Sequence, residues 1–217
     1  VSVKDKKGAI EELRADKVLV AVGRRAFSKG LGLESVGLET DKAGRVQVNG
    51  RYETAVPGLF AIGDLIAGPM LAHKAEEEGV AVAEFIAGQK GHVNYAVIPN
   101  IVYTHPELAA VGLTEAEAKE AGHEVNVGKY YYKPNGRAKS LAESDGLVKV
   151  VADAATDKLL GVHIVGARAS DLIAEAALAL ELGATSEQLA RTCHAHPTLS
   201  EIVKEAALAV HKRAIHA

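Results

Sequence analysis

The side chains best suited to acid–base chemistry gather in one stretch, Cys193-His194-Ala195-His196-Pro197-Thr198-Leu199-Ser200-Glu201. Proline disfavours helical backbone at the residue before it, so we expect His196 to lie on a turn. Thr198 and Glu201 have the spacing of a capping box, which predicts a helix from there to about His211. Glu201 would then lie within reach of His196. A carboxylate that holds an imidazole fixes its tautomer and raises its basicity, so this stretch predicts a histidine that moves protons.

Less specific interpretations of the same residues stay open. Glu201 can act only as a helix cap, and His194 and His196 can be surface or packing residues. A His-x-His pair can bind zinc, although a third ligand would have to come from elsewhere in the chain. Cys193 can be a thiol nucleophile, but a lone cysteine is more often a small buried residue.

Composition limits the classes of protein to consider. The chain has 217 residues, of which 48% are hydrophobic and 24% charged, enough for one large or two modest domains. The net charge of −3 gives no indication of a nucleic acid or an anionic membrane. No apolar run approaches the ~18 residues that a membrane span needs. We therefore expect neither nucleic acid nor membrane as a partner.

The single cysteine, Cys193, excludes an intrachain disulfide and favours a reducing compartment. The first residues do not resemble a signal peptide, so we expect a cytoplasmic location. The only methionine is Met70, and Val1-Ser2-Val3 has the pattern of a strand entering a hairpin. We expect the chain to be a piece of a longer protein, cut inside a domain.

The first part of the chain has the pattern of an α/β domain. A continuous apolar run at Val18–Val22 predicts a buried strand that ends at Gly23-Arg24-Arg25, where glycine permits close approach and arginines suit an anionic ligand. Val46–Val48 alternates as a strand. A second buried strand is predicted at Leu59–Ile62, ending in Gly63-Asp64, and an acid at that edge of an α/β sheet commonly faces a ligand.

A helix is predicted to follow the Gly68-Pro69 turn, from about Leu71 to Ala87. Its first turn, Met70 to His73, would direct backbone N–H groups toward whatever lies in front of Asp64, and such helix starts favour electron-rich atoms. We expect Glu76, Glu77 and Glu78 to form a solvated face.

The pattern changes after Gly91, where we place a domain boundary. The rest predicts an α+β domain, an antiparallel sheet covered by helices on one side. Strands are expected at 101–103, 109–111, 125–132, 147–152 and 159–165. Helices are expected from a second capping box at Thr114-Glu117 to about Gly122, and at 169–181, 186–192 and 198–211.

Three motifs of this chain, in this order, closely resemble the flavin-dependent pyridine nucleotide-disulfide oxidoreductases. They are Ala61-Ile62-Gly63-Asp64, Pro69-Met70-Leu71-Ala72-His73-Lys74 and His194-Ala195-His196-Pro197-Thr198-Leu199-Ser200-Glu201. The Gly23-Arg24-Arg25 and Val111-Gly112-Leu113-Thr114-Glu115 segments also fit. The resemblance covers essentially all 217 residues. The residues around the last two long motifs are more similar to the branch that oxidises dihydrolipoamide than to glutathione or thioredoxin reductases.

The resemblance implies an organisation in three parts: residues 1–23 as the tail of an NAD-binding domain, 24–93 as the C-terminal part of an FAD-binding and central domain, and 94–217 as a dimerisation domain. Asp64 and the backbone of Met70, Leu71, Ala72 and His73 would contact FAD. Gly23 would approach NAD. His196 would take a proton from a substrate thiol, with Glu201 orienting it, in the partner subunit's site of a homodimer.

The chain departs from the family pattern in two ways. It lacks the redox-active cysteine pair, since Cys193 is its only cysteine, and it lacks a Gly-x-Gly-x-x-Gly loop for either dinucleotide. We therefore expect this chain alone to be inactive and to bind neither FAD nor NAD tightly. The expected partners are a second copy and the lipoyl domains of a 2-oxoacid dehydrogenase or glycine cleavage complex. Another disulfide reductase, a non-catalytic dimerisation module and a zinc-dependent hydrolase using His194 and His196 are the alternatives.

Overall fold

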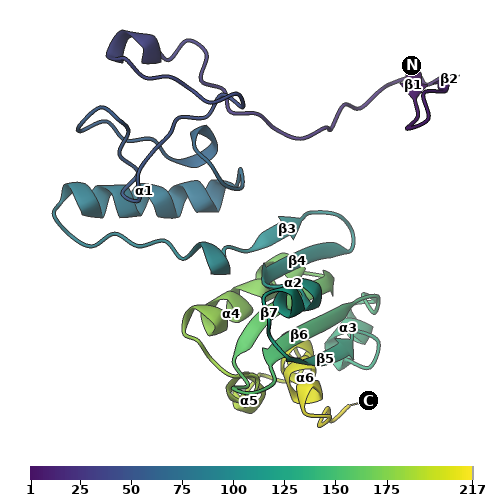
Figure 1. Cartoon of the computed structure of the whole chain (residues 1–217). Coiled ribbons are helices and arrows are strands. Elements are labelled where there is room, and N and C mark those ends of the chain that lie inside the picture. Colours follow the sequence, from purple (N-terminus) through teal and green to yellow (C-terminus); the bar gives the residue numbers. More distant parts are fainter. Residues whose placement is uncertain (217) are drawn as a thin grey trace. The chain divides into compact units, whose positions relative to one another are not determined.

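A computed structural model describes residues 1–216 (Figure 1). The chain divides into two compact units, Val1–Val93 and Asn94 onward. No helix among the described residues is both long enough and apolar enough to cross a bilayer.

The first unit contains a small core and a separate hairpin. Strands β1 (Ser2–Lys4) and β2 (Ile10–Glu12) pair antiparallel, which confirms the predicted hairpin. Two 3₁₀ turns, η1 (Leu33–Val36) and η2 (Gly63–Leu65), precede α1 (Ala72–Ile86), which confirms the helix predicted after the Gly68-Pro69 turn. The buried apolar side chains of this core are Val46, Tyr52, Ala61, Ile66 and Ala81.

The three strands predicted between residues 18 and 62 are wrong. Residues 18–22 are extended but unpaired, and Leu19 and Val22 are 89% and 93% exposed. Val46 and Phe60 form only isolated bridges, to Thr40 and Glu53. A buried strand exists only where neighbouring strands accept its hydrogen bonds, and residues 1–93 supply no such neighbours. The apolar runs at 18–22 and 59–62 therefore have the composition of buried strands but form no ladder among the described residues.

The second unit is built on a five-stranded antiparallel sheet in the order β3-β4-β7-β6-β5. All five strands lie where the sequence predicted them, within one or two residues. Their bounds are β3 (Asn100–Val102), β4 (Glu107–Gly112), β5 (Val125–Tyr131), β6 (Leu147–Asp153) and β7 (Leu159–Gly166). Strands β5, β6 and β7 form the predicted meander, and β7 then pairs with β4.

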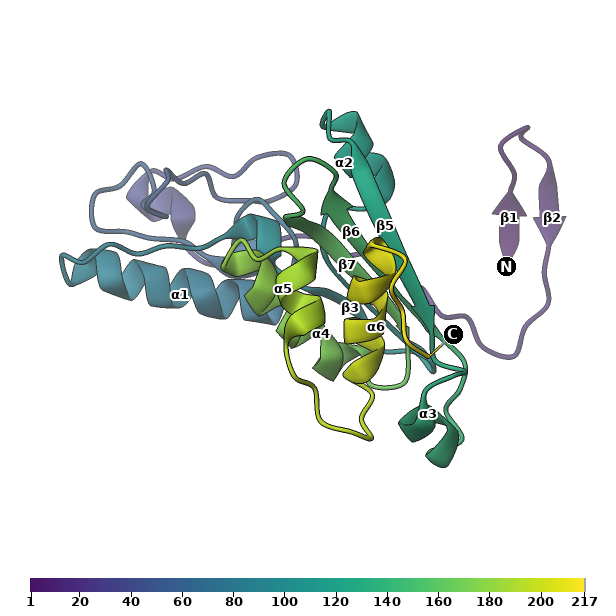
Figure 2. The ribbon, with the colours of Figure 1, turned by 90° about the horizontal axis from the view of Figure 1, so that it is seen from below.

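Two long helices, α4 (Ala169–Glu181) and α6 (Glu201–Val210), pack on one face of this sheet, and the short α5 (Ser186–Arg191) packs against α6 (Figures 1 and 2). Their apolar stripes meet alternate residues of the strands, such as Val148 and Val150, which are fully buried. The expected α+β class is thus confirmed. The sequence did not predict the short α3 (Gly136–Ser140).

The capping box predicted at Thr114 and Glu117 is present and starts α2 (Glu115–Glu120). Lys149 alternates with the core residues of β6, so its side chain leaves the opposite face of the sheet, where it pairs with Glu115 at 2.7 Å. Helix α2 therefore covers part of the second face, in addition to the helices on the first.

Helix α6 approaches β5 unusually closely. Gly128 of β5 has no side chain, and a Cβ placed there would lie 2.1 Å from the Ala206 carbonyl oxygen and 2.5 Å from the Val210 backbone nitrogen. The glycine therefore sets the depth at which α6 lies on the sheet, and α6 begins with the proposed acid–base residue Glu201.

Candidate functional site

The side chains of His196 and Glu201 face each other. His196 Nδ1 lies 2.9 Å from Glu201 Oε1, and a carboxylate only accepts hydrogen bonds, so Nδ1 donates. The neutral ring then has its lone pair on Nε2. Because the His196 side chain is 73% exposed while that of Glu201 is 19% exposed, the carboxylate is sheltered and the ring reaches into solvent. This geometry suits a proton acceptor held in one tautomer.

Glu201 is held from its other side by the backbone. Its Oε2 accepts the N–H of Thr198 at 2.8 Å. Burial raises the pKa of Glu201, but the Thr198 N–H and the His196 ring together lower it by more, and the net shift is downward. The lowered pKa favours the ionised carboxylate, which is the form that accepts both hydrogen bonds.

The helix start predicted in this stretch is only half right. Helix α6 begins at Glu201, with Ser200 as its N-cap and no side-chain cap. The Thr198 hydroxyl donates to the Ala195 carbonyl at 2.7 Å and does not cap the helix. Half of the capping box is therefore present, the Thr198 N–H to Glu201 bond, and the other half is missing because the Thr198 hydroxyl is directed at Ala195.

His194, left without an assigned role by the sequence, anchors the loop to α4. Its Nε2 lies 2.5 Å from Glu175 Oε1 and its Nδ1 lies 2.9 Å from the Thr192 carbonyl oxygen. Both partners are hydrogen-bond acceptors, so the contacts favour the form of the ring that carries a proton on each nitrogen. The Glu175 hydrogen bond raises the pKa of His194, against burial, which lowers it. Both nitrogens are occupied, which leaves none for a metal ion.

A second anchor comes from Asn135, which sequence reasoning missed. This buried side chain donates from Nδ2 to the Thr198 carbonyl at 3.0 Å, and its Oδ1 accepts the Ala138 N–H at 2.9 Å at the start of α3. The segment Pro134-Asn135-Gly136 has the composition of a plain turn, so nothing in it indicated a distant partner. Cys193, directly before the first anchor, is exposed.

The residues expected to contact FAD lie around the start of α1. Asp64 is exposed within η2, and the loop that carries it is tied to α1 by a fully buried ion pair, Lys74 to Glu78 at 3.0 Å. Glu78 Oε2 accepts the Gly63 N–H at 2.7 Å, and Lys74 Nζ donates to the Gly63 and Ala67 carbonyls at 3.2 and 3.3 Å. The expectation that Glu78 lies on a solvated face is therefore wrong, because this loop covers it. The periodicity of the helix could not predict that cover.

The start of α1 suits an electron-rich group. Leu71 is its N-cap and supplies no side-chain hydrogen bond, and no acidic residue lies in the first turn. Met70, Leu71 and His73 are half-buried and Ala72 is exposed. The backbone N–H groups of this turn are therefore available to an electron-rich ligand atom.

The residue expected to approach NAD, Gly23, has φ +101 and nothing within 4 Å of the place where a Cβ would lie. Its neighbour Arg24 pairs with Asp64 at 3.7 Å in an exposed contact. The Gly23-Arg24-Arg25 segment and the Gly63-Asp64 motif therefore lie side by side.

Two family models match the chain. Residues 98–207 match the dimerisation domain of the pyridine nucleotide-disulphide oxidoreductases, and residues 1–79 match the pyridine nucleotide-disulphide oxidoreductase model. The first match covers half of the chain and the whole sheet of the second unit.

Named relatives are similar over nearly all of the chain. Dihydrolipoyl dehydrogenase 1, mitochondrial, of Arabidopsis thaliana is 57% identical over 94% of this chain and 40% of the relative. Dihydrolipoyl dehydrogenase of Cupriavidus necator is 53% identical over 100% of this chain and 46% of the relative. Leghemoglobin reductase of Glycine max is 55% identical over 93% of this chain and 38% of the relative. The chain therefore spans less than half the length of these relatives.

Solved structures have the same fold. LpdA from Mycobacterium tuberculosis matches with a TM-score of 0.85 at 27% identity, over 95% of this chain and 45% of that one. The flavoprotein disulfide reductase RclA from Escherichia coli matches with a TM-score of 0.85 at 22% identity, over 91% and 47%, which shows the fold alone.

Proposed function

Because the chain belongs to the pyridine nucleotide-disulphide oxidoreductase family, we propose that it is the C-terminal part of an enzyme that oxidises dihydrolipoyl thiols with FAD and NAD. The observation that carries the proposal is the 2.9 Å contact between His196 Nδ1 and Glu201 on an exposed loop. The identities of 53% and 57% to proteins named dihydrolipoyl dehydrogenase support the choice of substrate.

His196 performs the proton transfer. Glu201 holds the proton on Nδ1, so Nε2 accepts the S–H proton of the substrate and leaves a thiolate. The carboxylate then stabilises the imidazolium that forms. The thiolate is the nucleophile for a disulfide. The two cysteines of that disulfide come from outside this chain, whose only cysteine is Cys193.

FAD, when bound, supplies two-electron chemistry between a disulfide and the nicotinamide. Asp64 would hold its ribityl or phosphate region, and the backbone of Met70, Leu71, Ala72 and His73 would line the flavin ring. Gly23 would admit the NAD nucleotide. The residues present fit these tasks because the α1 start is uncapped by side chains and the Asp64 loop is fixed by the Lys74–Glu78 pair.

Members of the family dimerise through the domain that residues 98–207 match. We assign residues 1–23 to the NAD-binding domain, 24–93 to the FAD-binding and central domain, and 94–217 to the dimerisation domain. In the dimer, the loop that carries His196 would enter the partner subunit's site. The lipoyl domains of a 2-oxoacid dehydrogenase or glycine cleavage complex would present the substrate. A cytoplasmic location stays a prediction, since the relatives include proteins named mitochondrial.

The test is reduction of NAD by dihydrolipoamide in the longer protein that carries this chain. We expect turnover with dihydrolipoamide and none with glutathione or thioredoxin as the thiol. The isolated 217-residue chain should be colourless and inactive. A preference for another thiol would reject the substrate assignment. An isolated chain that is yellow and active would reject the statement that the cysteine pair and tight FAD binding come from outside this chain.

The second candidate is another reductase of the same family. The soybean relative named leghemoglobin reductase is 55% identical, close to the dihydrolipoyl dehydrogenases, so overall similarity does not separate the two. Two reactions of one enzyme preparation separate them: reduction of NAD by dihydrolipoamide, in which the thiol donates electrons, and reduction of a leghemoglobin by NADH, in which the protein named in the relative accepts them.

A further inference from the structure

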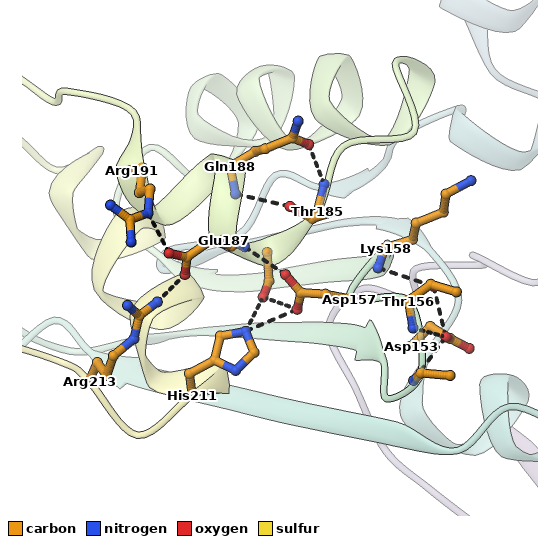
Figure 3. A network of polar contacts seen from close by, with 12 residues as sticks. Asp153, Thr156, Asp157, Lys158, Thr185, Glu187, Gln188, Arg191, His211 and Arg213 are labelled. Atoms are coloured by element: carbon orange, nitrogen blue, oxygen red, sulfur yellow. Dashed lines mark hydrogen bonds and ion pairs between the residues drawn. The ribbon is translucent and has the colours of Figure 1, made fainter.

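The segment that follows α6, residues 211–216, is tied to the rest of the second unit at three places. First, His211 Nε2 lies 3.0 Å from Asp157 Oδ1 and 3.2 Å from the Ser186 hydroxyl. Second, Arg213 pairs with Glu187 of α5 (Figure 3). The segment is therefore held in place although most of its side chains are exposed.

The third anchor is a carboxylate on α6 that the proposed reaction does not use. Glu205 is only 4% exposed. Its Oε2 accepts the Ile215 N–H at 2.7 Å, and its Oε1 accepts from His216 Nδ1 at 2.8 Å. The Tyr130 hydroxyl donates to the His216 carbonyl. A buried carboxylate needs such partners, because an uncompensated charge in the interior is costly.

This third anchor lies beside the His196–Glu201 pair. One small cavity, about 40 Å³, is lined by both the pair and the anchor, through Tyr130, Glu205 and His216. Burial raises the pKa of Tyr130 to about 12, and the negative charges of Glu205 and Glu201 add to the shift. His216 is among the charges that lower the pKa of Glu201. Four titratable groups thus face Glu201: His196, Glu205, His216 and Tyr130.

The arrangement has a clear electrostatic consequence. Glu201 and Glu205 lie four residues apart on one helix, where like charges repel. His216 lies near both and offsets that repulsion when it carries a proton. Without His216, Glu201 would face an unbalanced second carboxylate, and only His196 would balance it.

We propose that Glu205 and His216 are positioning residues for the acid–base pair: Glu205 holds His216 beside Glu201, and His216 offsets the negative charge of Glu205 next to the carboxylate that is directed at His196. The inference rests on the proposed role of that pair and deepens it. The dimerisation-domain model ends at residue 207, so the family match does not cover His216.

The test is titration of the Glu201 carboxyl carbon by NMR in the 217-residue chain. His216→Asn keeps a hydrogen-bond donor for Glu205 and removes the charge, and at 64% exposure the side chain tolerates the change. A chain ending at Arg213 removes the third anchor and keeps the other two. The control is His105→Asn, the same substitution at a 78% exposed histidine paired with Glu143 at 3.6 Å.

We expect the midpoint of Glu201 to rise by about half a pH unit in His216→Asn, by more in the shortened chain, and not at all in the control. Core amide shifts report that each variant is folded. An unchanged Glu201 midpoint in either folded variant overturns the proposal and shows that the segment is only structural. The titration does not measure turnover, so an unchanged midpoint would say nothing against dihydrolipoamide as the substrate. A failed dihydrolipoamide assay would likewise say nothing against a shift in the Glu201 midpoint.

Discussion

Substituting Gly128 with alanine tests whether the packing of α6 controls the site. The new Cβ would lie 2.1 Å from the Ala206 carbonyl oxygen and 2.9 Å from Val210 Cγ2, whereas ordinary contacts begin at 3.4 Å. Backbone atoms cannot turn aside as a flexible side chain can, so α6 must withdraw from β5 by about 1 Å. Overpacking of this kind costs about 1–3 kcal/mol, and the lost contacts of Ile202 and Ala206 place G128A at the upper end.

Urea unfolding followed by far-ultraviolet circular dichroism measures this cost. The matched control is Gly136→Ala, because a Cβ there has nothing within 4 Å and α3 gains a better helix former. We expect G136A to be neutral or more stable by up to about 1 kcal/mol. A second readout is the Nδ1–H signal of His196, which should weaken in G128A as Glu201 moves with α6. If G128A were as stable as G136A, the close helix–strand contact and the reasoning built on it would be refuted.

Four further changes have definite expected outcomes. Lys74→Met leaves the Glu78 carboxylate buried and without its lysine, so the hydrogen-exchange protection of the α1 amides should fall by about 3–5 kcal/mol. Adding Glu78→Leu should restore much of this protection, and a loss under about 1 kcal/mol in Lys74→Met alone would contradict the buried pair. Asn135→Ala should cost about 1–3 kcal/mol in urea unfolding and free the His196 loop to proteolysis, and an unchanged midpoint would rule out the anchor. His194→Asn should lower the free energy of unfolding most at acidic pH. The pKa of His194 is raised in the folded state, so the stability that this side chain contributes is complete below about pH 6.5 and is lost as the pH rises through the folded-state pKa. A loss of stability that does not depend on pH would contradict this. His163→Leu should stabilise by about 1 kcal/mol, because neither buried ring nitrogen has a partner within residues 1–216, and a loss of stability would show that a partner exists.

The second unit could be predicted from the sequence almost completely. Its strands alternate over a one-sided core, its turns contain Asp145-Gly146 and Asp157-Lys158, and the helix after Thr114 carries its own start signal. These are local signals, and the antiparallel sheet needs only neighbours that the same chain supplies.

The first unit could not be predicted in the same way. Its apolar runs at 18–22 and 59–62 have the composition of central strands, but a strand forms only beside partner strands, which local composition does not reveal. Glu78 shows the same limit on a helix: periodicity places it beside Glu77 on a polar stretch, whereas tertiary contact with the Gly63 loop buries it.

The contact between His196 and Glu201 was predicted from their spacing, and the residues that support it were not. Glu201 lies five residues after His196, near enough for a short loop to join them. Asn135 holds the loop through Thr198, which lies 63 residues later in the chain. Glu205 of α6 holds the following segment through Ile215, which lies 10 residues later. No pattern within a single element encodes such contacts.

The most direct test of the central claim is a single-turnover measurement with His196→Gln in the longer protein that carries this chain. We expect the rate of enzyme reduction by dihydrolipoamide to fall by about 10²–10⁴-fold, while oxidation of NADH by an artificial electron acceptor, which needs no thiol deprotonation, stays within a factor of two. An unchanged rate with dihydrolipoamide, or an equal fall in both reactions, would contradict it.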